Sequence, residues 1–165
     1  MASEAEAELG TKGCNEEMSN GTLTDREVRT TRVFAVPQER VFAAWTEPGL
    51  LARWWGPRGF TNTFHRFELR PGGIWEFTMH GPDGAAFNNT CVFKRIEPFA
   101  FLEFDHLKEM HFYKAMVRFM EVTGGTEVDW TMRFDAEEEL APIRSFIQQA
   151  NEENMDRLEA LLLNP

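Results

Sequence analysis

In FLEFDHLKEMHFYKAMVRFMEVTGGTEVDWTMRF (residues 101–134), three predicted strands alternate with two turns. A period of two in the apolar residues indicates the strands, and Leu107–Met110 and Gly124-Gly125 are typical of hairpin turns. A four-residue loop and a two-residue turn predict these opposed pairs: His106 with His111, Phe104 with Tyr113, Val117 with Met132, and Phe119 with Trp130. Both turns place the same residues on one inner face of an antiparallel sheet.

A second predicted hairpin lies upstream, in IWEFTMHGPDGAAFNNTCVF (residues 74–93). Trp75, Phe77 and Met79 alternate with polar residues, so these side chains are expected to point inward. Pairing Phe77 with Asn88 places Asn88, Thr90 and Val92 on the inner face as well. Cys91 is then expected to face outward and to be inert. A bulge would reverse this register.

The predicted inner face is not purely apolar. It carries Asn88, His106, His111 and Tyr113, and Asn151 lies on the apolar stripe of a C-terminal helix that would cover it. A buried polar group without a partner costs about 1–3 kcal/mol. Several such groups together therefore predict mutual hydrogen bonds, water or a ligand, and hence a cavity between the sheet and the helix.

The remaining elements frame this sheet. Residues 26–36 predict a strand, residues 37–45 a helix with Pro37 in its first turn, and residues 47–55 a second short helix with Thr46 as its N-cap. Five further strands are expected after these helices. The apolar spacing over residues 137–163 predicts one long amphipathic helix. This order of elements indicates an α+β fold.

Two adjacent tryptophans end the second short helix, in LLARWWGPRGF (residues 50–60). Neighbouring helical positions point about 100° apart, so Trp54 and Trp55 cannot face the same way. The favoured interpretation is that one ring packs into the core while the other lines the cavity mouth. A shared ligand-binding wall and an exposed anchor for a partner are the alternatives.

Composition excludes several classes of function. The chain of 165 residues has a net charge of −10, which argues against nucleic acid and anionic membranes as partners. Cys14 and Cys91 form no disulfide framework or metal cluster. No signal peptide is evident, and no apolar run reaches the ~20 residues of a membrane span, so a cytoplasmic location is expected. Residues 1–25 are expected to be a disordered acidic leader to a domain at 26–165.

Four stretches carry a family resemblance: TRVFAVPQERVFAAWTEPGLLARWWGPRGF (31–60), ELRPGGIWEFTMHGPDG (68–84), RIEP (95–98) and NEENMDRLEALL (151–162). They resemble the START-like (SRPBCC) helix-grip superfamily, and most closely the bacterial single-domain, polyketide-cyclase-like relatives of the activator of heat shock protein 90 ATPase. The resemblance implies a curved antiparallel sheet around a long C-terminal helix, with a hydrophobic cavity between them. Members bind lipids, sterols, hormones and polyketides, and some are enzymes.

The favoured hypothesis is a protein that binds a small hydrophobic molecule in this cavity, without a metal or cofactor. The predicted site comprises Trp54, Trp55, Phe60, Trp75, Phe77, Met79, Asn88, His106, His111, Tyr113, Val117, Trp130, Ile147 and Asn151. Its polar members would orient the polar ends of the ligand.

Two other functions remain alternatives. In a cyclase- or isomerase-like enzyme, the two histidines and Tyr113 would move protons on a carbonyl compound. The second alternative, which the family resemblance implies, is a stress-response co-chaperone that activates the ATPase of heat shock protein 90, with that chaperone as the candidate partner. Eukaryotic co-chaperones of this type carry a further N-terminal domain where this chain has its acidic leader. Phe101, Phe112 and Met116 on the outer sheet face are a candidate homodimer contact.

Overall fold

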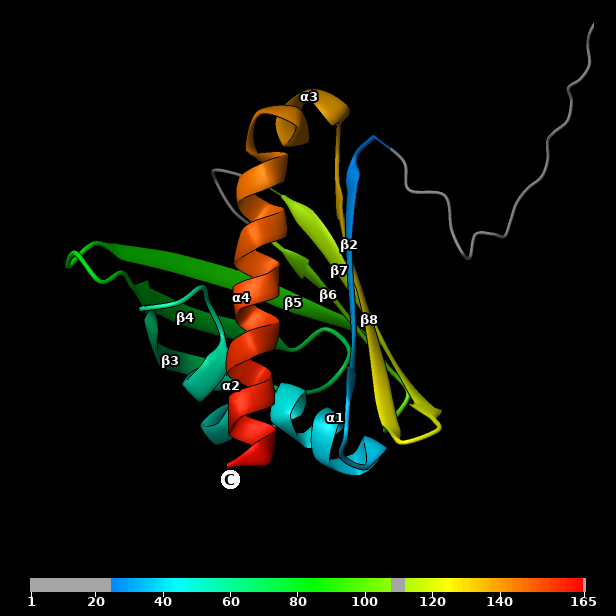
Figure 1. Cartoon of the computed structure of the whole chain (residues 1–165). Helices are drawn as coiled ribbons and strands as arrows, with labels where there is room; N and C mark the ends of the chain where they lie inside the picture. The colour runs from blue at the N-terminus through cyan, green and yellow to red at the C-terminus, as the bar shows by residue number, and fades with distance from the viewer. Residues whose placement is uncertain (1–24, 108–111, 165) are drawn as a thin grey trace, which may run out of the picture.

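The computed structural model describes residues 25–107 and 112–164. In these residues, seven strands form one antiparallel sheet in the order β2-β8-β7-β6-β5-β4-β3, and the long helix α4 lies across one face (Figure 1). The strands are β2 (Glu27–Phe34), β3 (Thr61–Phe67), β4 (Ile74–His80), β5 (Ala86–Glu97), β6 (Phe101–His106), β7 (Tyr113–Val122) and β8 (Gly125–Phe134). The expected α+β helix-grip fold is confirmed, with six strands rather than five after the first. No helix in the described part of the chain is long and apolar enough to cross a membrane.

The two short helices form where the sequence predicts them, but their boundary differs. Helix α1 spans Gln38–Thr46 and follows Pro37, and helix α2 spans Pro48–Trp54. Thr46 does not cap α2, because its hydroxyl donates a hydrogen bond to the Phe42 carbonyl at 2.7 Å within α1. Glu47 takes the N-cap position, and Pro48 occupies the first turn, where its missing N–H is not needed.

The C-terminal segment is not one continuous helix. Helix α3 spans Glu137–Leu140, a 3₁₀ turn spans Ala141–Ile143, and helix α4 spans Arg144–Leu163. Pro142 lies in the middle of the turn, and proline interrupts a helix because it removes a backbone donor and clashes with the preceding turn. The buried residues of α4 are Asn151, Asn154, Met155, Leu158 and Leu162, and none precedes Asn151.

The central register is shifted by two residues from the prediction. His106 pairs with Tyr113 and Val117 with Trp130, so the β6–β7 connection is longer than four residues. The β7–β8 turn comprises Thr123-Gly124 instead of Gly124-Gly125. Gly125 pairs with Val122 and belongs to β8, where only glycine fits because the Phe34 carbonyl would lie 1.9 Å from any Cβ. A shift of two residues keeps every side chain on its face, so the predicted inner face is correct.

The register of β5 is shifted by one residue, and this shift reverses its faces. Phe77 pairs with Asn89 rather than Asn88, and Trp75 pairs with Cys91. The predicted inward placement of Asn88, Thr90 and Val92 is therefore wrong, because the loop after His80 contains one residue more than the assumed turn. Asn88 is exposed on the outer face, where its side chain accepts a hydrogen bond from Thr78. Cys91 is fully buried, contrary to the prediction.

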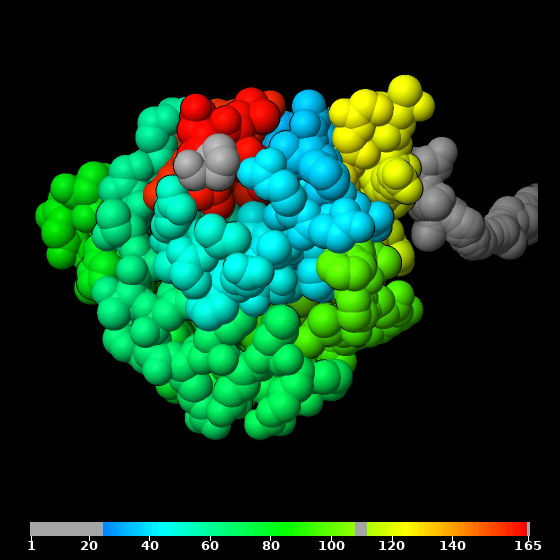
Figure 2. Space-filling model, turned by 90° about the horizontal axis from the view of Figure 1, so that it is seen from below, coloured from blue at the N-terminus to red at the C-terminus, as the bar shows by residue number. Residues whose placement is uncertain are grey.

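One end of the molecule is closely filled. Figure 2 views the C-terminal end of α4, where α1 and α2 cover the space between α4 and the sheet. At this end, α1 and α2 both contact α4, and α1 also contacts β7 and β8. Figure 1 shows α3 at the opposite end of α4, where neither short helix reaches. The two ends of the same helix–sheet interface therefore have different coverings.

Candidate functional site

A cavity of about 140 Å³ lies between the sheet and the first half of α4. Most of its lining is aromatic or apolar, and a few polar side chains are interspersed. The lining residues are Trp55, Gly56, Pro57, Phe77, Met79, Asn89, His106, Tyr113, Trp130, Met132, Ile147, Ala150, Asn151 and Asn154. A cavity of comparable size, about 150 Å³ and lined by apolar side chains, is known to accept a benzene ring.

The five tryptophans of the chain form one continuous cluster beside this cavity. Trp45 contacts Trp54 at a centroid distance of 4.8 Å and Trp130 at 5.4 Å, and Trp55 contacts Trp75 at 5.4 Å. The rings meet mostly edge to face, the arrangement that aromatic quadrupoles favour. This cluster fills the interface under α1 and α2 and forms one wall of the cavity.

The paired tryptophans are both buried, but they have different surroundings. Trp54 is 1% exposed, and its indole nitrogen donates to the Ala44 carbonyl at 2.9 Å, so this ring belongs to the core. Trp55 is also buried, at 6% exposure, but its ring lines the cavity. Helix α2 ends between the two residues, which turns Trp55 toward β4 and β8.

Helix α4 holds the segment after Trp55 in place. Gly56 donates its backbone N–H to Oδ1 of Asn154 at 2.8 Å. The Arg157 guanidinium donates to the carbonyls of Gly56 at 2.9 Å, Pro57 at 3.0 Å and Arg53 at 3.1 Å. Burial lowers the pKa of this guanidinium. These contacts fix the wall of the cavity that Trp55, Gly56 and Pro57 form.

Gly56 is favoured at this wall by its backbone conformation. Its φ of +104° lies in a region that side chains with a Cβ disfavour. A Cβ there would also lie 2.9 Å from Cε of Met79, the flexible end of a side chain that lines the cavity. A larger residue at position 56 would therefore strain the backbone and displace Met79.

His106 and Tyr113 lie face to face at the end of β6 and β7. Their ring centroids are 4.7 Å apart and the ring planes differ by 6°. Nε2 of His106 is 2.8 Å from Oδ1 of Asn89, whose amide nitrogen donates to the Phe87 carbonyl. Burial raises the pKa of the Tyr113 hydroxyl well above its usual value, and the nearby Cys91 adds to the rise. The hydroxyl therefore stays protonated at neutral pH.

Asn151 is the polar residue that α4 contributes to the middle of the cavity. It is 4% exposed, and its amide nitrogen lies 3.3 Å from Oγ1 of Thr30 and 3.4 Å from Sδ of Met132. Thr30 and Met132 belong to β2 and β8. Asn151 thus links α4 to strands β2 and β8, whereas Asn89 belongs to β5.

Eight of the fourteen predicted residues line the cavity: Trp55, Phe77, Met79, His106, Tyr113, Trp130, Ile147 and Asn151. Trp54, Trp75 and Val117 are buried in the core instead. Phe60 contacts Phe87 at 6.3 Å, outside the lining. Asn88 faces outward, and His111 lies outside the described residues.

Six lining residues lie outside the predicted site: Gly56, Pro57, Asn89, Met132, Ala150 and Asn154. Met132 was expected on the inner face, and Ala150 and Asn154 are within one helical turn of Asn151 on α4. Asn89 was missed because of the one-residue shift of β5. That shift follows from the five-residue connection between His80 and Ala86, whose length no local sequence pattern indicates.

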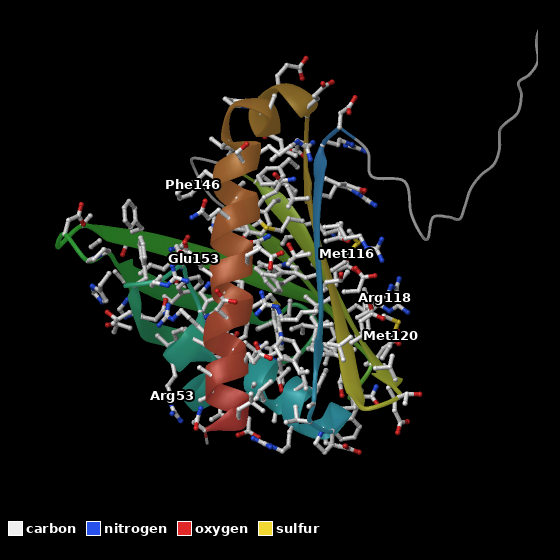
Figure 3. The ribbon with its side chains drawn as sticks, in the orientation of Figure 1. Arg53, Met116, Arg118, Met120, Phe146 and Glu153 are labelled. Atoms are coloured by element: carbon white, nitrogen blue, oxygen red, sulfur yellow. The ribbon has the colours of Figure 1, made fainter. Side chains whose placement is uncertain are left out.

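The outer face of the sheet is not the apolar surface that the sequence suggested. Phe101 is 3% exposed, because the guanidinium groups of Arg95 and Arg118 each lie 4.8 Å from its ring centroid, on the side away from α4. Lys114 bonds to Glu103 and Asp105, both at 2.8 Å. Figure 3 shows Met116, Arg118 and Met120 on this outer side of β7.

The comparisons with known proteins match this architecture. The family model described as Activator of Hsp90 ATPase homolog 1-like protein matches residues 35–163. The chain belongs to this family. The membership confirms the resemblance drawn from the sequence motifs. No curated protein matches the sequence.

Solved bacterial structures share the fold along nearly their whole length. A protein from Arthrobacter aurescens is 26% identical, with a TM-score of 0.79 over 86% of this chain and 88% of that one. A protein from Rhodobacter sphaeroides is also 26% identical, with a TM-score of 0.78 over 87% and 95%. A protein from Nitrosomonas europaea, 21% identical, has a TM-score of 0.77 over 84% and 95% and shares the fold.

Proposed function

We propose that this member of the family binds a small hydrophobic molecule in the cavity between the sheet and α4. The observation that carries the proposal is the lining itself: aromatic and thioether side chains surround about 140 Å³, with a few polar groups among them. Ligand sites typically combine such an apolar wall with sparse polar groups that orient the ligand.

The size of the cavity favours a ligand of about one ring. Pockets for drug-sized ligands are usually about 300–1,000 Å³. A sterol or a long acyl chain is larger than the space that the side chains leave. Among the ligand classes that helix-grip proteins bind, a small aromatic or alicyclic compound therefore fits this chain best.

Native mass spectrometry of the protein purified from its own host is the first test. We expect a bound molecule of low mass, released by organic extraction. An apo mass, together with no thermal stabilisation by a panel of one-ring compounds, would contradict the proposal, because a ligand that binds only the folded state must raise its stability.

A pair of matched variants locates the binding. Ala150 lines the cavity, whereas Ala160 is exposed on the same helix. Ala150→Phe fills the cavity and is expected to abolish binding. Ala160→Phe adds the same ring outside and is expected to leave binding unchanged. Equal binding by both variants would show that the ligand sits elsewhere.

A further inference from the structure

The amide oxygen of Asn151 borders the cavity and accepts no hydrogen bond from the residues that the structure describes. The two amide hydrogens of Asn151 are directed at Thr30 and Met132, at 3.3 and 3.4 Å. A thioether sulfur accepts hydrogen bonds and donates none, so the contact with Met132 fixes which end of the amide faces β8. Oδ1 of Asn151 is therefore the end of the amide that is available to a ligand in the cavity.

A second polar atom of the lining is also without a partner. The Tyr113 hydroxyl makes no hydrogen bond to any residue that the structure describes, while its ring stacks on His106. A protonated phenol both donates and accepts. The indole Nε1 of Trp130, which also belongs to the lining, is buried and has no hydrogen-bond partner among the described residues. The cavity therefore offers an acceptor from α4, a donor–acceptor from β7 and an indole donor from β8.

The other amides of the lining are already engaged. Asn89 bonds to His106 through its oxygen and to the Phe87 carbonyl through its nitrogen. Asn154 accepts from Gly56 and donates to the Ala150 carbonyl. Asn151, Tyr113 and the indole N–H of Trp130 are therefore the groups that a ligand would satisfy.

The charge of the lining restricts the ligand further. No Lys, Arg, Asp or Glu is among the described residues that line the cavity. Arg157, which lies beyond the Gly56–Pro57 wall, directs its guanidinium to backbone carbonyls. A carboxylate in this cavity would lose its hydration without gaining a cation, which is strongly unfavourable. A neutral polar group has no such cost.

We infer that the ligand is a neutral, one-ring compound bearing a hydroxyl group, with the hydroxyl hydrogen bonded to Oδ1 of Asn151. The inference rests on the proposed function and narrows it to phenols and cyclic alcohols. The Tyr113 hydroxyl provides a second hydrogen bond to a polar group of the ligand. Trp55, Phe77 and Trp130 hold the ring.

A size-matched panel tests this assignment by calorimetric titration. The probes differ in their polar group. The hydroxyl of 4-methylphenol donates and accepts hydrogen bonds, the ether of 4-methylanisole only accepts them, 4-xylene does neither, and 4-methylbenzoate carries a negative charge. We expect 4-methylphenol to bind about five- to tenfold more tightly than 4-xylene, the effect of one hydrogen bond to a buried polar atom. We expect 4-methylanisole, which can accept a hydrogen bond from Tyr113 or Trp130 but cannot donate one to Asn151, to bind more weakly than 4-methylphenol and more tightly than 4-xylene. We expect 4-methylbenzoate not to bind.

Two variants assign the preference to its residues. Asn151→Leu keeps the volume of the side chain and removes the acceptor, so the ratio between 4-methylphenol and 4-xylene should fall toward one while 4-xylene still binds. Tyr113→Phe should reduce the same ratio, and it tests the assignment independently if Asn151→Leu fails to fold. Asn88→Leu, on the outer face, is the control that should keep the wild-type ratio.

The outcomes separate the two proposals. Equal affinity for 4-methylphenol and 4-xylene, or tightest binding of 4-methylbenzoate, overturns the hydroxyl assignment while the cavity remains a binding site. A preference for 4-methylphenol that survives in both Asn151→Leu and Tyr113→Phe also overturns it. Binding of none of the four probes by a folded wild-type protein contradicts the proposed function, and the hydroxyl assignment falls with it.

Discussion

The two ends of the interface between α4 and the sheet are formed by the same helix and the same sheet, but their side chains pack to different densities. At the C-terminal end of α4, Met155, Leu158 and Leu162 are at most 3% exposed beneath α1 and α2. At the other end, α4 has no fully buried side chain before Asn151, and Phe146 is 69% exposed (Figure 3). The cavity lies on this second side.

The difference comes from what covers the sheet. Two short helices add the rings of Trp45 and Trp54 to one end, and these rings fill the space that a single helix leaves above a curved sheet. The other end lacks these two helices, and the Ala150 and Asn151 side chains of α4 are too small to fill the space beside them. The packed end stabilises the fold, and the hollow end is free to bind a ligand.

The largest effect is expected at the centre of the packed end. Trp45 contacts Trp54, Trp55, Phe119 and Trp130. Trp45→Ala should lower the free energy of unfolding by about 3–5 kcal/mol, the usual loss for a large aromatic in a core. Denaturant titration measures this change, and Phe146→Ala at the hollow end should change it by less than about 0.5 kcal/mol. Similar losses from both variants would contradict the contrast.

A smaller loss of stability is expected where Arg157 of α4 binds the backbone of residues 53–57, between the packed end and the cavity. Arg157→Leu retains apolar volume but removes the hydrogen bonds to the carbonyls of Arg53, Gly56 and Pro57. We expect a loss of about 2 kcal/mol, the range for a hydrogen-bonded charged group. Arg53→Ala is the matched control, because that side chain is exposed on α2. A loss below 0.5 kcal/mol, within the range of ordinary surface changes, would mean that Arg157 does not secure this wall.

Enlarging one alanine at each end compares the packing directly. Ala44 is 1% exposed in α1, and Ala150 lines the cavity. Ala44→Leu should cost about 1–3 kcal/mol, because overpacking strains a filled core. Ala150→Leu should cost nothing, because the added methyl groups enter empty space. Thermal and denaturant unfolding measure the stability of both variants. A larger loss of stability for Ala150→Leu than for Ala44→Leu would contradict the comparison.

The smallest effect is confined to alkaline pH. Tyr113 is the single tyrosine of the chain, so tyrosinate absorbance reports it alone. Burial raises the pKa of its hydroxyl in the folded protein, whereas the unfolded chain should titrate near about 10. The unfolded state loses its proton first, so stability is constant below that pH and falls as pH rises above it. If the tyrosinate absorbance of the folded protein showed a pKa near about 10, the Tyr113 hydroxyl would be in contact with solvent, contrary to this account.

The sequence predicted the inner face of the sheet better than its strand pairing. A two-residue error in both central turns left Val117, Trp130 and Tyr113 on the correct side, because side chains alternate with a period of two. A one-residue error in the loop after His80 exchanged Asn88 for Asn89. The length of a loop is set by contacts that the local sequence does not reveal. A register error of an odd number of residues moves each side chain to the other face of the sheet, whereas an even error does not.

The tertiary fold also decided details that propensity could not. Trp54 lies in the core and Trp55 lines the cavity, but the end of α2 after Trp54, rather than helical geometry, sets the direction of the second ring. Phe101 lies on the outer face as expected, but Arg95 and Arg118 cover its ring, and this covering could not be read from the alternation of apolar residues. The Asn154 and Arg157 contacts to the Gly56 segment join residues almost 100 positions apart, and no local pattern predicts them.

A crystal structure of the protein grown with 4-bromophenol tests the central claim most directly. Anomalous scattering locates the bromine without reference to the surrounding atoms. We predict one bromine between the sheet and α4, enclosed by Trp55, Phe77 and Trp130, with the phenol oxygen within hydrogen-bond distance of Oδ1 of Asn151. Bromine found only on the surface, with the space beside Ala150 left empty, would contradict the claim that the hollow end is a ligand-binding site.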